Sequence, residues 1–285
     1  MSPATTPAGV PRPGTDRLWG ESWYFDFASA DGSAGGFVRV GDYPNLGRRW
    51  CWAYVIAGQR AVGCALDRPL TGRRDAPWQT MDPSLRLLIE PALDCWHISA
   101  DGDGFGLDLT WREQGPRYVY AHGSRLEQPG WAAGDVSIDG KPRPLDGPGQ
   151  RDHSWGVRDW WRLGWTWCAG WLSDGTRFQA TLLDARGLIA PDGYLMAPGR
   201  PPESVGDVAV HADAVRMDGT LLEFADVAHV TIDLRSPAGG VSRLRRAMTR
   251  VRTGATQHGI GWRERNMPEL SSRSRRPARN GLAGG

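Results

Sequence analysis

Hydrophobic and polar residues alternate along this chain in short segments that turn residues separate. In residues 21–28, Trp23, Phe25 and Phe27 fall on one face, and residues 49–57 repeat the alternation with further aromatic side chains. A period of two residues is typical of a β-strand with one buried face. Further strands are predicted in the first half, at residues 36–40, 60–66, 84–89, 95–100, 106–111, 118–126, 133–138 and 142–145.

The second half of the chain follows the same pattern. Residues 164–172 place tryptophans on one face, and the other predicted strands lie at residues 176–184, 208–215, 220–224, 227–234 and 259–265. Residues 244–251 fit either a helix or a strand. Because no long segment repeats every ~3.6 residues, the pattern argues against an α/β fold. Many short antiparallel strands instead predict an all-β chain with two barrel-like halves in tandem.

A glycine- and proline-rich segment near the middle of the chain predicts where the two halves meet. Asp146-Gly147-Pro148-Gly149 interrupts the alternation, since both residue types disturb regular strands. We therefore expect an N-terminal domain over residues 18–146 and a C-terminal domain over residues 147–270. Residues 1–17 are predicted to be flexible, and residues 271–285 to form a disordered basic tail.

Composition is that of a folded chain with a substantial core. Of the 285 residues 40% are hydrophobic, and 15 tryptophans are present. The sequence contains no run of 18 apolar residues, and its first 15 residues lack an apolar segment, so we expect a cytoplasmic protein without stable membrane insertion. The four cysteines form no C-x-x-C pair, which favours free thiols in a reducing compartment.

The net charge of +2 conceals an uneven distribution. Residues 241–285 carry 11 arginines against Glu264 and Glu269, which leaves the preceding 240 residues at about −7. Arginine is nearly the only cation, because Lys141 is the sole lysine. We interpret the basic end as solvated and do not predict nucleic-acid binding.

Residues 149–161 carry the candidate chemistry. They contain two Arg-Asp steps beside a histidine, and six of the 15 tryptophans fall within residues 155–171. In an extended strand, Arg151, His153 and Trp155 would share one face, and Asp152 and Ser154 the other. Gly156 indicates a bulge or a close backbone approach, so the faces of the residues that follow are left open.

Two interpretations of this segment stay open from the residue types. In the functional one, His153 handles a proton near neutral pH, with Asp152 or Asp159 fixing its tautomer, beside an indole wall that holds a hydrophobic substrate. In the structural one, Arg-Asp pairs and indole N–H groups satisfy one another where the two halves meet.

Other chemistries fit the sequence less well. Asp152 stands where a G-x-S-x-G elbow needs glycine, and the histidines lack the H-x-x-x-H spacing of a metal site. Residues 101–112 lack two ligand positions of a calcium loop, and residues 102–106 lack the G-x-G-x-x-G register of a dinucleotide site. We therefore predict neither a metal nor a cofactor.

The segment Asp152-His153-Ser154-Trp155-Gly156 resembles the Asp-His-x-Trp-Gly signature of the carotenoid 1,2-hydratase (hydroxyneurosporene synthase) superfamily. That group includes kievitone hydratases, AttH-like proteins and lipocalin-like Diels–Alderases. The longer form is similar to that of a bacterial branch, in which five other segments also recur: Glu21-Ser22-Trp23-Tyr24-Phe25-Asp26, Gly36-Phe37-Val38-Arg39, Tyr43-Pro44-Asn45, Trp52-Ala53-Tyr54 and Glu127-Gln128-Pro129. The resemblance is strong over residues 19–171 and weak beyond.

This resemblance implies two tandem lipocalin-like antiparallel β-barrels with a cavity near their interface. It also implies large apolar substrates of terpenoid, steroid or polyketide type. Asp152, His153 and Trp155 match the signature, whereas Arg158 and Asp159 belong to the longer form. Residues 176–181 lack the Tyr/Asp pair that the hydratase branch places in the strand after the signature. Hydration, isomerisation, cyclisation and plain binding therefore stay open.

The sequence thus predicts a cofactor-free enzyme of the hydratase, isomerase or cyclase type. Its expected catalytic residues are Asp152, His153, Arg158 and Asp159. Substrate binding is expected from Trp155, Trp160, Trp161, Trp165 and Glu127. A non-catalytic lipid or isoprenoid carrier is the alternative function, and a structural scaffold without a cavity is the third. The sequence makes no prediction of oligomeric state.

Overall fold

The chain folds almost entirely into β-strands. The computed structural model describes residues 13–72, 76–121, 124–185, 188–211, 213–236 and 238–269. Residues 1–12 of the expected flexible N-terminus and the basic tail at 271–285 lie outside the described residues. Within those ranges there is no α-helix, and the sole helical element is a 3-10 turn, η1 (Pro44–Leu46). No helix in this part of the chain has the length and apolar character needed to cross a membrane.

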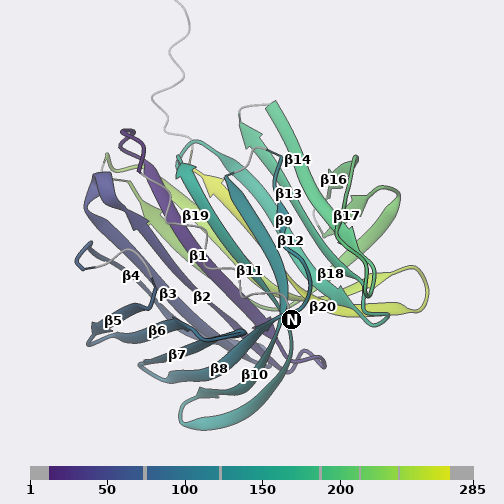
Figure 1. Ribbon diagram of the computed structural model, residues 1–285, viewed down its shortest axis with the longest axis horizontal. Helices are drawn as coiled ribbons and strands as arrows, with labels where there is room; N and C mark the ends of the chain where they lie inside the picture. The colour runs from purple at the N-terminus through teal and green to yellow at the C-terminus, as the bar shows by residue number, and fades with distance from the viewer. Residues whose placement is uncertain are drawn as a thin grey trace, which may run out of the picture.

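The first sheet holds the strands of the N-terminal half. Its order is β4-β3-β2-β1-β11-β10-β8-β7-β6-β5, with β9 beside β10, and neighbours pair antiparallel. Figure 1 shows it curling, with β5 to β8 folded under β1 to β4. The bounds are β1 (Trp19–Ala28), β2 (Ala34–Tyr43), β3 (Arg48–Ala57), β4 (Arg60–Pro69), β5 (Trp78–Asp82), β6 (Leu85–Pro91), β7 (Cys95–Gly102), β8 (Phe105–Glu113), β9 (Tyr118–Val119), β10 (Arg125–Ile138) and β11 (Lys141–Val157).

The second sheet holds the remaining strands, in the order β15-β14-β13-β12-β20-β19-β18-β17-β16. It also curls into a half-barrel, so the prediction of an all-β chain with two tandem lipocalin-like barrels is confirmed (Figure 1). The bounds are β12 (Gly164–Leu172), β13 (Arg177–Ala185), β14 (Leu188–Met196), β15 (Glu203–Ser204), β16 (Val208–Val210), β17 (Ala214–Met217), β18 (Thr220–Arg235), β19 (Val241–Thr253) and β20 (Gln257–Pro268).

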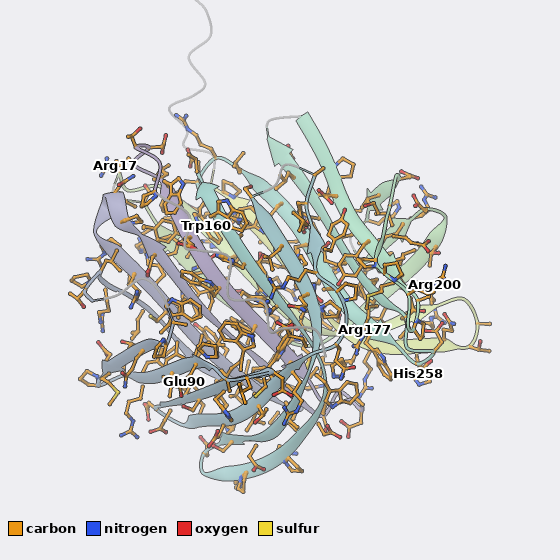
Figure 2. The ribbon with its side chains drawn as sticks, viewed as in Figure 1. Arg17, Glu90, Trp160, Arg177, Arg200 and His258 are labelled. Atoms are coloured by element: carbon orange, nitrogen blue, oxygen red, sulfur yellow. The ribbon has the colours of Figure 1, made fainter. Side chains whose placement is uncertain are left out.

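Besides a small cluster of Tyr118, Tyr120, Tyr194 and Met196, three apolar clusters hold these sheets together. One fills the first half-barrel and another the second, while the third lies between the two sheets. The alternation along β1 explains why this strand is buried on both faces: Trp23 and Phe25 enter the first cluster, and Tyr24 enters the cluster between the sheets. Of the residues labelled in Figure 2, Trp160 is buried, whereas Glu90 and Arg200 are exposed.

The segment predicted as a domain junction lies inside a strand. Residues 146–149 belong to β11, which pairs with β10 on one side and, from Arg151 onward, with β1 on the other. The chain passes from the first sheet to the second later, through residues 158–163. The stretch at 118–126 is divided between β9 and β10, and the ambiguous residues 244–251 lie in β19.

Candidate functional site

A pocket of about 350 Å³ lies between the two sheets. Its walls come from β1, β2, β3, β10 and β11 of the first sheet and from β12, β13, β19 and β20 of the second, together with the connection at residues 158–163. The volume falls within the usual range for small-molecule sites. The side chains that line the pocket include Tyr24, Arg39, Trp52, Tyr120, Arg125, Asp152, Trp155, Arg158, Asp159, Trp160, Trp165, Trp167, Thr181, Arg246 and Glu264.

The end of β11 supplies one wall of the pocket. Because successive side chains of a strand point to opposite faces, Asp152 and Ser154 line the pocket, and His153 between them does not. Gly156 adopts a φ of 111°, which favours glycine, and the strand ends at Val157. The chain then crosses the pocket edge with Arg158 and Asp159.

Two ion pairs fix the carboxylates that face the pocket. Asp152, which is 5% exposed, pairs with the guanidinium of Arg125. Glu264, on β20 of the second sheet, pairs with Arg246 and accepts a hydrogen bond from Trp165 Nε1 at 2.7 Å. Each of these two acidic side chains is therefore held by a guanidinium in a buried setting.

Glu127 lies directly behind this wall and is fully buried. It pairs with Arg125 at 2.7 Å and accepts hydrogen bonds from Trp167 Nε1 and Gln150 Nε2, both at 2.9 Å. Burial raises its pKa to about 7, against the lowering effect of Arg125. This carboxyl can therefore gain or lose a proton near neutral pH.

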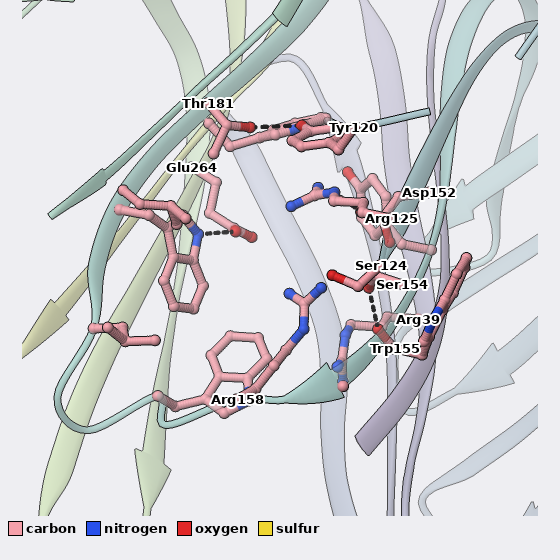
Figure 3. A pocket seen from close by; sticks show the side chains of 18 of the residues that line it. Arg39, Tyr120, Ser124, Arg125, Asp152, Ser154, Trp155, Arg158, Thr181 and Glu264 are labelled. Atoms are coloured by element: carbon pink, nitrogen blue, oxygen red, sulfur yellow. Dashed lines mark hydrogen bonds and ion pairs between the residues drawn. The ribbon is translucent and has the colours of Figure 1, made fainter. Parts of the chain in front are cut away.

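A tyrosine connects Glu127 with the pocket. The Tyr120 hydroxyl lies 3.3 Å from Glu127 Oε1 and 2.7 Å from the Thr181 hydroxyl (Figure 3). Gln179 Nε2 donates to the same oxygen at 2.6 Å. Burial raises the pKa of Tyr120 well above its usual value, so the phenol is neutral and keeps its proton. The hydroxyls of Tyr120 and Thr181 form a hydrogen-bonded path from Glu127 to the pocket surface.

A second carboxyl with the same property lies behind Tyr24. The Tyr24 hydroxyl donates to Asp26 Oδ2 at 3.0 Å, and the backbone N–H of Gln150 donates to Oδ1 at 2.8 Å. Burial raises the pKa of Asp26 to about 7. The guanidinium of Arg246 lies 4.0 Å from the centre of the Tyr24 ring.

The structure brings most of the predicted site residues together around this pocket. Those that line it are Asp152, Arg158, Asp159, Trp155, Trp160 and Trp165, whereas Glu127 lies behind the wall. Trp161 does not line the pocket. Its indole N–H donates to the Leu234 carbonyl at 2.9 Å, and its ring meets that of Trp50 edge-on.

His153 lies on the opposite face of β11. Its Nε2 is 2.9 Å from Glu21 Oε1, and its ring stacks on Trp23 with the centroids 5.2 Å apart. Because Glu21 belongs to β1, this contact joins the side chains of two paired strands. The ring also lies 5.0 Å from Trp155. His153 therefore supports the pocket wall from behind, and the pocket surface is formed without it.

Sequence reasoning missed several residues that line the pocket. They are Arg39, Tyr120, Arg125, Arg246 and Glu264, which come from three regions that are distant along the chain, near residues 39, 120–125 and 246–264. Arg39 lies in the Gly-Phe-Val-Arg step that accompanies the signature, which was a signal for its importance. Among the described residues no group of three or more His, Cys, Asp or Glu side chains is placed to hold a metal ion.

Comparisons with known proteins agree with this fold. A family model described as a domain of unknown function (DUF7064) matches residues 9–269. The comparison with curated proteins gave no match. Similar solved structures include a protein described as AttH from Nitrosomonas europaea, with a TM-score of 0.65 and 13% identity over 94% of this chain and 100% of that one.

Two further solved structures have the same architecture. CghA with Sch210972 has a TM-score of 0.62 and 14% identity, covering 93% of this chain and 94% of that one. Kievitone hydratase from Nectria haematococca has a TM-score of 0.62 and 9% identity, with coverages of 94% and 96%. At such identities the likeness shows the fold alone, and this is the fold that the resemblance of the signature implies.

Proposed function

We propose that this chain, which belongs to the family described as a domain of unknown function (DUF7064), binds a large hydrophobic molecule between its two sheets and catalyses cofactor-free acid–base chemistry on it. One observation carries the proposal. A single pocket combines indole walls, the ion-paired carboxylate of Asp152 and a hydroxyl path to Glu127, whose pKa is about 7. Excluding water beside such groups strengthens their action on a bound substrate.

The walls favour an apolar substrate of terpenoid, steroid or polyketide type. Trp52, Trp155, Trp160 and Trp165 present aromatic surface to the pocket, and Trp167 closes it on the Glu127 side. Indole faces bind apolar rings and chains and stabilise developing positive charge. Two proteins of similar fold, kievitone hydratase and CghA with Sch210972, are respectively named as an enzyme and as a complex with a small molecule, which supports a ligand-binding pocket here.

The groups divide into an acceptor and a donor. Asp152, held as a carboxylate by Arg125, accepts a proton from the substrate. Glu127 supplies a proton through the hydroxyls of Tyr120 and Thr181. Isomerisation adds a proton at one carbon and removes one from another, and an acid-initiated cyclisation that ends in an alkene begins and ends with the same two steps. In hydration the proton is likewise added at carbon, and the acceptor takes a proton from the attacking water. His153 acts as a positioning residue, because its bond to Glu21 ties β11 to β1 behind the pocket wall.

Binding and turnover are measured separately to test this function. A panel of terpenoids, steroids and polyketides is titrated against the wild type by tryptophan fluorescence, and conversion is followed by mass spectrometry. Asp152→Asn and Thr181→Val are expected to bind the converted ligand within about threefold of wild type and to lose at least tenfold in kcat. Full turnover in both variants would refute the assignment.

A hydrophobic carrier is the second candidate. It is favoured by the ion pairs themselves, because the carboxylates of Asp152 and Glu264 are both already engaged by arginines. A carrier would bind the panel tightly and convert none of it. Either function fits a reducing compartment such as the cytoplasm, since Cys51, Cys64, Cys95 and Cys168 are free thiols. Fractionation of the native host tests that location.

A further inference from the structure

The arginines of the pocket outnumber the carboxylates that pair with them. Four arginines line it. Arg125 pairs with both Asp152 and Glu127, and Arg246 pairs with Glu264. Arg39 and Arg158 have no acidic partner within the described part of the chain. The third lining carboxylate, Asp159, pairs at 3.7 Å with Arg162, whose side chain is 71% exposed and does not line the pocket.

Arg39 is built into the pocket wall with an unused donor. It is 4% exposed, its Nη2 donates to the Tyr43 hydroxyl at 3.2 Å, and its Nη1 has no hydrogen-bond partner. The guanidinium carbon lies 4.5 Å from the ring centre of Trp52 and 5.2 Å from that of Trp160. Gly41 makes room for it, because a Cβ there would lie 2.5 Å from Nη1. A buried donor left unpaired is costly unless a ligand satisfies it.

Arg158 reaches the same space from the connection between the sheets. Its backbone N–H donates to the Leu18 carbonyl at 3.1 Å, which anchors the residue. Figure 3 shows its guanidinium extending into the middle of the pocket. Burial and the nearby charges of Arg125 and Arg39 lower its pKa, against the raising effect of Asp152, which is itself paired with Arg125. A bound anion would compensate the positive charge of Arg158.

We propose that Arg39 and Arg158 bind the carboxylate of an amphipathic acid whose apolar body lies against Trp155, Trp160 and Trp165. This inference rests on the proposed function and names its substrate class. Guanidinium groups suit carboxylates because their N–H donors match the two oxygens. In Figure 3, Tyr120 and Thr181 lie at the top of the view, and Arg39 and Arg158 lie below them. A carboxylate held at Arg39 therefore leaves the far part of the molecule beside the proton-handling groups.

Two probes that share one apolar body test this. All-trans-retinoic acid and all-trans-retinol have the same polyene and differ in the head group, and both quench tryptophan fluorescence on binding. We expect the wild type to bind the acid at least tenfold more tightly than the alcohol, because charge-assisted hydrogen bonds are the stronger kind. In Arg158→Gln the preference is expected to fall to less than threefold, with the affinity for the alcohol unchanged.

The control is Arg162→Gln, which removes an exposed arginine from the same connection and should keep the full preference. Arg39→Gln tests the second guanidinium, and its binding of retinol together with its melting temperature shows whether the buried site is still folded. Equal affinity for acid and alcohol in the wild type, or an undiminished preference in Arg158→Gln, would overturn the inference and leave the proposed function standing. Failure of the wild type to bind either retinoid would overturn both.

Discussion

Replacement of Asp26 by asparagine should make the protein less sensitive to alkaline pH. Asp26 is 2% exposed, and burial raises the pKa of its carboxyl from 3.8 to about 7 in the folded protein. Between these two values the unfolded chain has released the proton that the folded chain still holds. The free energy of unfolding therefore falls as the pH rises, by about 1.4 kcal/mol per pH unit.

Asparagine has the same shape and cannot ionise. Its oxygen can still accept from the backbone N–H of Gln150, and its amide can donate to the Tyr24 hydroxyl, which rotates to accept. The Asp26→Asn variant should therefore gain stability relative to the wild type as the pH rises. From pH 5 to pH 8 the expected gain is roughly 2 to 3 kcal/mol, since most of the folded-state titration falls in that interval.

Guanidinium chloride unfolding, followed by tryptophan fluorescence at pH 5 and at pH 8, measures this difference. Asp103→Asn is the control, because Asp103 is an exposed aspartate in the turn between β7 and β8. The control should leave the pH dependence of stability unchanged. A difference between Asp26→Asn and wild type that stays constant within about 0.5 kcal/mol over this range would refute the reasoning.

Three other substitutions test the remaining parts of the account. Wild-type turnover should fall as the pH rises through about 7, because Glu127 there loses the proton that it donates. Glu127→Gln should turn over at least tenfold more slowly, and its pH–rate profile should not show this fall. Gly41→Ala should lower the free energy of unfolding by about 1–3 kcal/mol, because the new Cβ meets the Arg39 guanidinium; thermal denaturation measures this loss. His153→Ala should destabilise the fold by about 1–3 kcal/mol through loss of the bond to Glu21, yet change ligand affinity less than threefold; a larger affinity change would place His153 in the pocket after all.

Alternation predicted the strands well where both faces of a strand meet apolar surroundings. Successive side chains of β1 enter two different apolar clusters: Trp23 packs in the first half-barrel and Tyr24 packs between the two sheets. The strand β14 (Leu188–Met196) was missed because Pro191 and Gly193 interrupt its pattern, and its pairing with β13 is what makes it a strand. That pairing depends on contacts which the local sequence does not reveal.

Glycines at the predicted junction have a different role from the one the sequence suggested. A Cβ on Gly147 would lie 2.1 Å from the Ala28 carbonyl oxygen, and one on Gly149 would lie 2.3 Å from that of Asp26. These residues let β11 approach the backbone of β1 closely. The glycines thus mark a place where two strands lie very close together. A linker and such a close approach both favour glycine, so the local sequence does not distinguish them.

The candidate site was predictable in part. The signature placed Asp152 and the tryptophans near one another, but the sequence could not tell which face of β11 would meet the second sheet. That choice brought Asp152 to the pocket and turned His153 away. Glu264 reaches the pocket through the pairing of β20 with β12, which joins residues nearly a hundred positions apart, and Arg246 follows through the pairing of β19 with β20. Such long-range pairing leaves no local signal.

The central claim is that the pocket moves protons to and from a bound hydrophobic molecule. Deuterium incorporation tests it most directly: a ligand that binds by tryptophan quenching is incubated with the protein in D2O, and its mass is followed over time. The account predicts that the wild type introduces deuterium at carbon, and that Asp152→Asn binds the ligand equally well but introduces at least tenfold less. Tight binding with no incorporation by the wild type would contradict the account and identify the protein as a carrier.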